Sequence, residues 1–225
     1  MGKEILVYSY KITYFGGTAP CYDDGKYTLA ICKRDMRRVI GKAMTANPNL
    51  EVWIVAINGQ KLGSEFQYEQ INHIAKIKNV ITFGEYFNSK NTRKDCIYEE
   101  CSKETKYISE DKYFKAKEKN GIHDDENLQD RDWNIYKNKE CRSEKYVLCS
   151  DEFKFITSEE ESDFIKGKIG VDNLAKGVGH KHCSVDEEVN EYLLKIVKES
   201  DNHGITKSIQ KYQREKGGCG KDKAI

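Results

Sequence analysis

The sequence is poor in proline and in long apolar runs. It has 2 prolines in 225 residues, which excludes collagen-like and proline-rich linker architectures. No apolar run approaches the roughly 20 residues of a membrane-spanning helix. An excess of one charge is also missing, because 38 basic residues balance 37 acidic ones to a net charge of +1. Proteins that coat nucleic acid by electrostatics alone are thereby excluded, and any polyanion site must be a local patch.

Familiar catalytic motifs are absent as well. The chain has no Walker A pattern, no Gly-x-Gly-x-x-Gly, no Gly-x-Ser-x-Gly and no kinase motif set, so the common nucleoside-triphosphate and hydrolase classes have no support. Its 8 cysteines include no Cys-x-x-Cys pair, the spacing typical of structural zinc sites. We therefore expect no structural metal held by these cysteines, and we expect dispersed thiols.

The N-terminus lacks the continuous apolar core of a signal peptide. Residues 4–14 instead alternate apolar and polar side chains, which predicts a strand. We accordingly expect a cytoplasmic protein with no membrane association, in which the cysteines stay reduced.

Aromatic residues are plentiful, with 14 Tyr, 8 Phe and 2 Trp, too many for a disordered chain. The low mean hydropathy of −0.78 has a local origin, because residues 89–130 are rich in Lys, Glu, Asp and Asn and have no clear period. We interpret this segment as a polar insertion in one domain covering residues 1–225, with a frayed tail after about residue 203.

Several segments alternate or are continuously apolar, and these predict strands. They cover residues 4–14, 26–32, 50–58, 66–78, 145–150 and 152–156. Helices are predicted at 33–45, at 82–88 with Thr82 as cap and Glu85 in the capping-box position, and at 185–198 with Ser184 and Glu187 as a capping box. This order predicts an α+β fold: a curved, mostly antiparallel sheet or small barrel, with short helices and a C-terminal helix.

A basic cluster stands where the strand at 26–32 gives way to a helix. Lys33, Arg37 and Arg38 carry it, and Gly17 lies in the preceding glycine-rich loop. Arginine forks and helix N-termini bind phosphate, so the cluster indicates a phosphate or nucleotide site. The alternative is a solvated basic helix face, the ordinary place for charge runs.

A second candidate is the segment 177–183, in which His180 and His182 follow two glycines. We interpret it as a loop whose histidines could bind metal or transfer a proton. The alternative is two histidines without a role. Aromatic side chains such as Tyr10 and Trp53 could stack on a base, although alternating aromatics more often belong to a core.

Several short blocks, taken in order, resemble one family. They are Tyr8–Thr13, Gly17–Pro20, Thr28–Lys33, Arg37–Arg38, Glu51–Val55, Asn134–Tyr136, Val147–Phe153 and Gly177–His180. The pattern is similar to the nucleotide modification associated domain (Nmad) family over most of residues 5–198, apart from the insertion. Arg34 stands where that family favours proline, and Glu51-Val52 replaces Gly-Asp; both departures concern turns and leave the basic pair intact.

The resemblance implies a prokaryotic or phage protein of a DNA base-modification or defence system. On that basis Lys33, Arg37 and Arg38 would hold phosphate, Tyr10 or Trp53 would stack on a base, and His180 would carry a proton. Three hypotheses stay open: an enzyme acting on a nucleotide or DNA base, a non-catalytic reader of a modified base or small nucleotide, and an interaction module whose partner-binding arm is 89–130. The sequence does not identify a cofactor.

Overall fold

The computed structural model describes residues 3–12, 20–23, 25–30, 33–59, 67–82, 85–86, 146–177 and 179–199. Their strands are β1 (Ile5–Ile12), β2 (Cys21–Asp23), β3 (Lys26–Leu29), β4 (Glu51–Asn58), β5 (Ile71–Ile77), β6 (Asn79–Thr82), β7 (Tyr146–Ser150), β8 (Glu152–Phe155) and β9 (His180–Ser184). The helices are α1 (Arg34–Ala46), α5 (Glu159–Ile169), the 3-10 turn η1 (Val171–Asn173) and α6 (Glu187–Lys198). No helix within these residues is long and apolar enough to cross a membrane.

The strands form two sheets. A five-stranded sheet has the order β8-β5-β4-β1-β9, and a four-stranded sheet has the order β2-β3-β7-β6. Among the described strands, only β1 and β4 run parallel, with Ile5 opposite Glu51, while the other strand pairs are antiparallel. The predicted α+β class with a mostly antiparallel sheet is confirmed, and among the described strands the sheets do not close into a barrel.

Curvature arises where the chain passes from one sheet to the other. β5 leads into β6 through Lys78, and β7 leads into β8 through Asp151. The Ser150 hydroxyl donates to the Lys76 carbonyl at 2.5 Å and accepts from the Glu152 amide at 2.9 Å. The Lys78 ammonium lies 2.6 Å from the Glu152 carboxylate. These contacts hold the two bends together.

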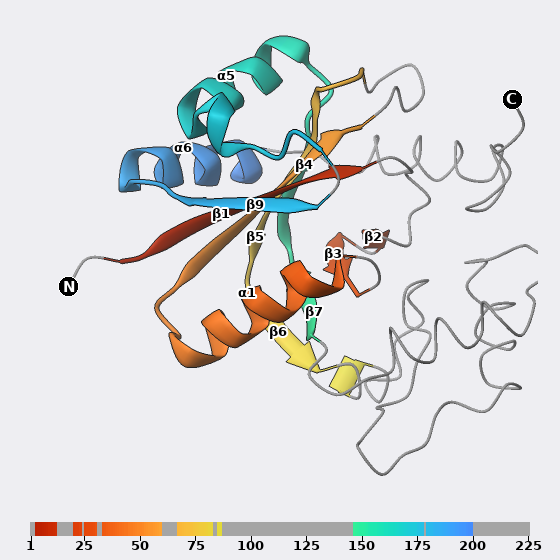
Figure 1. Cartoon of the computed structure of the whole chain (residues 1–225), viewed down its shortest axis with the longest axis vertical. Helices are drawn as coiled ribbons and strands as arrows, with labels where there is room; N and C mark the ends of the chain where they lie inside the picture. The colour runs from red at the N-terminus through yellow and green to blue at the C-terminus, as the bar shows by residue number, and fades with distance from the viewer. Residues whose placement is uncertain are drawn as a thin grey trace, which may run out of the picture.

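Alternation along the strands gives the five-stranded sheet two apolar faces. Tyr8 and Tyr10 of β1 pack on one face with α1 and the smaller sheet, whereas Val7 packs on the other face with α5 and α6. Figure 1 shows α1 on one side of the sheet and α5 and α6 on the opposite side. Because the strand period is two, neighbouring residues of β1 and β9 belong to different faces, and this decides which of them can meet α1.

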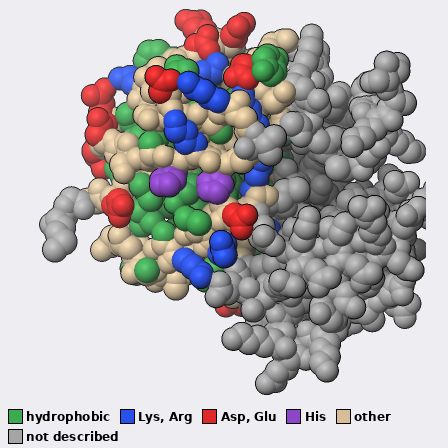
Figure 2. All heavy atoms as spheres, in the orientation of Figure 1, with side chains coloured by type: hydrophobic (Ala, Val, Ile, Leu, Met, Phe, Trp, Pro, Cys, Tyr) green, Lys and Arg blue, Asp and Glu red, His purple; other side chains and the backbone are tan. Residues whose placement is uncertain are grey.

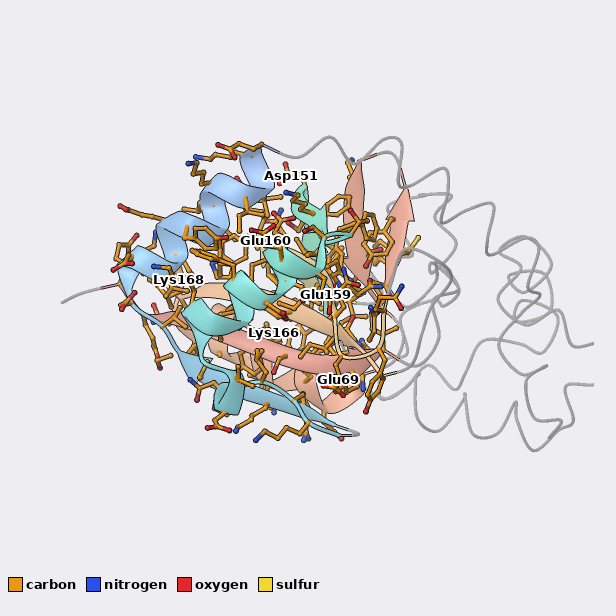
Figure 3. The ribbon with its side chains drawn as sticks, turned by 90° about the horizontal axis from the view of Figure 1, so that it is seen from above. Glu69, Asp151, Glu159, Glu160, Lys166 and Lys168 are labelled. Atoms are coloured by element: carbon orange, nitrogen blue, oxygen red, sulfur yellow. The ribbon has the colours of Figure 1, made fainter. Side chains whose placement is uncertain are left out.

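The helix on residues 159–169 was not predicted from the sequence, although its capping pattern is present. The Ser158 side chain accepts from the Glu161 amide at 3.3 Å, as an N-cap does. Figure 3 shows Glu159, Glu160, Lys166 and Lys168 along α5. Acidic residues occupy its first turn and basic residues its last turn. These charges interact favourably with the helix dipole and stabilise the helix. Lys168 also binds Glu188 of α6 at 2.6 Å, so this surface is balanced in charge.

Three sequence predictions require correction. The segment at 177–183 is not all loop, because residues 180–184 form β9 along β1. The N-cap of α6 is Asp186, which accepts from the Val189 amide at 3.0 Å, while Ser184 ends β9. The strand predicted at 66–78 begins only at Ile71. In contrast, the Thr82–Glu85 capping box is confirmed, since the Glu85 amide donates to the Thr82 hydroxyl at 3.2 Å.

Candidate functional site

Three elements distant in sequence meet at one place on the α1 face of the sheet. Tyr10 lies near the end of β1, and its register partner on β9 is His180. The Lys33 ammonium, at the start of α1, lies 5.2 Å from the centroid of the Tyr10 ring. Asp35 and Lys33 are both close enough to His180 to influence its pKa. We call Tyr10, Lys33, Asp35, His180 and His182 the β1–α1–β9 site.

Lys33 has a backbone conformation that is unusual for a residue other than glycine. Its φ of 47° and ψ of 39° are left-handed, and its side chain makes no capping hydrogen bond to α1. Left-handed non-glycine residues carry strain and cluster at functional sites. A lysine ammonium has no acceptor atom. The Lys33 side chain therefore does not cap the first backbone N–H groups of the 13-residue helix. The positive end of its dipole favours an anion there.

Arg38 adds a second cation on the exposed side of α1. Its guanidinium lies 3.7 Å from the Asp35 carboxylate, and the two side chains are 50% and 60% exposed. An exposed pair of this kind contributes little to stability. Breaking this ion pair, so that the Arg38 guanidinium turns toward a phosphate group at the start of α1, therefore costs little free energy.

The two histidines of β9 form an aromatic surface over Tyr8. His180 and His182 are exposed, and their rings lie 6.3 Å and 5.2 Å from the Tyr8 ring, centroid to centroid. Figure 2 shows histidine side chains side by side on an open face, bordered by hydrophobic, acidic and basic side chains. Between them Lys181 turns to the other face, where its ammonium bonds the Asp172 carbonyl. No lysine therefore separates the two imidazoles.

The electrostatics of the site keep one imidazole ready to accept a proton. Partial burial lowers the pKa of His180 below its usual 6.5, and His182 and Lys33 lower it further, against an opposing effect of Asp35. The lowered pKa favours the neutral His180 ring, in which one nitrogen carries a free lone pair.

Other predicted site residues lie elsewhere. Trp53 is fully buried on the α5–α6 face, where its indole N–H donates to the Asn190 side chain at 3.0 Å. Arg37 is 1% exposed and donates to the Tyr146 carbonyl at 2.6 Å. Gly17 lies outside the described residues. The structure thus brings Tyr10, Lys33 and His180 together, with Tyr10 only 2% exposed and lying in the core beneath Lys33. It does not bring Trp53 or the Arg37 guanidinium to this place.

A buried polar chain near this core was not anticipated from the sequence. The Asn58 side-chain N–H₂ donates to the Gln67 carbonyl at 2.8 Å, which fixes its oxygen toward the Asn72 N–H₂ at 3.0 Å. The Asn72 oxygen then faces His73 Nδ1 at 2.9 Å, so Nδ1 carries the proton. Polar Asn72 and His73 within the apolar strand sequence INHIAKI were the available signal.

A hollow lies on the four-stranded sheet, away from the β1–α1–β9 site. It measures about 790 Å³ and is lined by residues including Thr28, Tyr86, Cys149 and Glu152. Of the predicted site residues that the structure describes, none lines it. Within the described part of the chain, no group of three or more His, Cys, Asp or Glu side chains is placed to hold a metal ion. The structure describes three cysteines, of which Cys21 is buried and Cys149 and Cys183 are half-buried.

Comparison with known protein families identifies the family of this chain. The sequence model of nucleotide modification associated domain 2 matches residues 4–213. The protein belongs to this family. The match spans β1, α1 and β9, and hence the whole β1–α1–β9 site, and it agrees with the resemblance seen in the sequence blocks. Comparisons with curated proteins and with solved structures gave no match. The name of nucleotide modification associated domain 2 ties the family to nucleotide modification and specifies no reaction.

Proposed function

We propose that this protein binds a nucleotide, or a single base extruded from DNA, at the β1–α1–β9 site. The observation that carries the proposal is the left-handed Lys33 at the start of α1, with its ammonium over Tyr10 and beside His180. A phosphate at this position would accept from the helix N-terminus and be neutralised by Lys33 and Arg38. The net charge of +1 favours one nucleotide over a long duplex tract.

His180 gives the site its chemistry in this proposal. Its neutral ring accepts a proton from a bound nucleotide or from a water molecule beside it. Together with the family's link to nucleotide modification, this supports a role in a prokaryotic or phage system of DNA base modification or defence. A reader of a modified base would use the same surface without turnover. The interaction-module hypothesis concerns residues 89–130, which lie outside the described residues.

Binding is tested by replacing Lys33. We expect Lys33→Ala to weaken binding of deoxynucleoside 5′-monophosphates by about 10- to 150-fold, since a charge-assisted hydrogen bond contributes about 1.5–3 kcal/mol. Isothermal titration calorimetry with dAMP, dCMP, dGMP and dTMP measures the change. Lys168→Ala is the matched control, because that lysine is paired with Glu188 on the opposite side of the sheet. Equal affinities for the wild type and Lys33→Ala would refute the site.

Turnover is tested separately from binding. The protein is incubated with the four deoxynucleotides and with DNA carrying modified bases, and the products are analysed by mass spectrometry. For an enzyme we expect product formation that falls about 100-fold or more in His180→Asn, as for loss of a general base, while binding persists. A ligand that is retained but unchanged identifies a reader and removes the proton-transfer role of His180.

A further inference from the structure

We infer that His182 forms the base subsite of the site proposed above, by stacking a planar nucleobase on its outer ring face. The inference rests on the proposed nucleotide binding. His182 lies on the edge strand β9, whose only described neighbour is β1. Its ring stacks on Tyr8 at 5.2 Å with an interplanar angle of 22°. Because the inner face lies on a buried tyrosine and the residue is nevertheless exposed, the outer face is open to a ligand.

Packing beneath the ring holds this surface in place. Tyr8 is only 2% exposed and belongs to the core that includes Ile54 and Met36. A ring that is already stacked loses little conformational freedom when a second planar group covers it. On the other face of the same strand, Cys183 packs against the α5–α6 core, which fixes the orientation of β9. His182 therefore offers a pre-oriented aromatic platform.

The platform lies at a suitable distance from the proposed phosphate position. His180 is opposite Tyr10 and His182 is opposite Tyr8, so the two imidazoles share the α1 face at adjacent same-face positions. Two residues along a strand span about 7 Å. A phosphate at Lys33 near His180 therefore leaves room for the sugar before the base reaches His182. This arrangement selects a mononucleotide or a single extruded nucleotide as ligand.

Stacking gives affinity without selecting a base. Base–aromatic stacking contributes about 1–3 kcal/mol, and every base offers a π face. All four deoxynucleotides should therefore gain from His182 by about 5- to 150-fold over a sugar phosphate that lacks a base. The subsite accounts for base affinity, whereas the phosphate contacts of Lys33 serve every ligand equally.

The test compares ligands with and without a base. Wild type, His182→Ala, His182→Phe and Lys181→Ala are titrated with the four deoxynucleotides and with 2-deoxyribose 5-phosphate, in buffer containing EDTA. We expect His182→Ala to lower deoxynucleotide affinity to that of the sugar phosphate and to leave sugar-phosphate binding unchanged. His182→Phe should retain the base-dependent gain. Lys181→Ala is the matched control from the opposite strand face and should bind like the wild type.

The remaining outcomes separate the two proposals. If sugar phosphate and deoxynucleotides bind the wild type equally, the base subsite is wrong while phosphate binding stands. If His182→Phe loses the gain as fully as His182→Ala, stacking is wrong and the ring acts through its nitrogens. If binding occurs only without EDTA, a metal held by the two histidines replaces the stacking account. If no ligand binds, the proposed function itself fails.

Discussion

Acidification from pH 6.5 to pH 5 is expected to lower the free energy of unfolding through His73 by about 2 kcal/mol. Burial lowers the pKa of the His73 imidazole from 6.5 to about 3. Between these two values the unfolded chain binds a proton that the folded chain excludes, so stability falls as the pH falls. The slope is about 1.4 kcal/mol per pH unit, and the total loss near pH 3 is about 5 kcal/mol.

The geometry around His73 gives the physical reason for this exclusion. The side chain is 0% exposed and lies between Tyr22, Tyr27 and Phe155. Its Nδ1 contacts the Tyr22 hydroxyl at 2.8 Å and the Asn72 oxygen at 2.9 Å. Its Nε2 has no hydrogen-bond partner among the described residues. A proton at Nε2 would place a charge in this aromatic core without an acceptor, which is strongly unfavourable.

Urea denaturation at pH 7.0, 6.5, 6.0, 5.5 and 5.0 measures the effect, because carboxylates contribute mainly below this range. His73→Gln keeps a polar group at the position and removes the titration, so its stability should be nearly flat where that of the wild type falls. His180→Gln is the matched control, since it removes an exposed imidazole whose pKa is also lowered and should preserve most of the slope. Identical slopes for the wild type and His73→Gln would contradict the prediction.

Replacing Trp53 by phenylalanine should destabilise the protein by about 3 kcal/mol and leave nucleotide affinity unchanged. The indole is fully buried, donates to Asn190 at 3.0 Å, and lies 5.9 Å from the Lys76 ammonium. Phenylalanine removes the N–H and leaves both a cavity and an unsatisfied Asn190 oxygen. The sequence hypothesis that Trp53 stacks on a base predicts the opposite result, a loss of affinity at nearly constant stability.

A double-mutant cycle isolates the buried hydrogen bond. Trp53→Phe, Asn190→Leu and the double variant are compared by urea denaturation, and deoxynucleotide binding is measured for each. Removing both partners avoids the orphaned oxygen, so the double variant should be about 1–2 kcal/mol more stable than the sum of the single effects predicts. Additive losses of stability would show that the hydrogen bond contributes little. A loss of nucleotide affinity in Trp53→Phe would instead support a role of Trp53 in nucleotide binding.

Much of the architecture could be predicted from the sequence because its signals are local. The strands at β1, β4, β7 and β8 follow from alternation or continuous apolar runs, and the start of α1 falls next to the predicted position at Lys33. The error at β9 has a physical reason. His-Lys-His-Cys-Ser has little strand propensity, and its strand conformation comes from hydrogen bonding to β1, a partner about 170 residues away.

Most residues of the β1–α1–β9 site were candidates from the sequence, but Asp35 was not, and the arrangement of the site could not be predicted. Lys33, Tyr10 and His180 were singled out from residue type and spacing, but nothing local indicates that they meet. Trp53 was proposed as a base-stacking residue on the same grounds as Tyr10. In the structure the two side chains lie on opposite faces of the five-stranded sheet. In β1 and β4 the strand period sends Tyr10 to the α1 face and Trp53 to the α5–α6 face.

The sequence by itself therefore determined the α+β class, the main strands, the first and last described helices and the family, because propensity, periodicity and ordered motifs are encoded by neighbouring residues. The tertiary structure alone decided which side chains share a surface. It joined His180 and His182 to Lys33 through the β1–β9 pairing, buried Arg37 and Trp53, and enclosed His73 among aromatic rings. Such outcomes depend on the pairing and the facing of distant strands, which a single stretch of sequence does not contain.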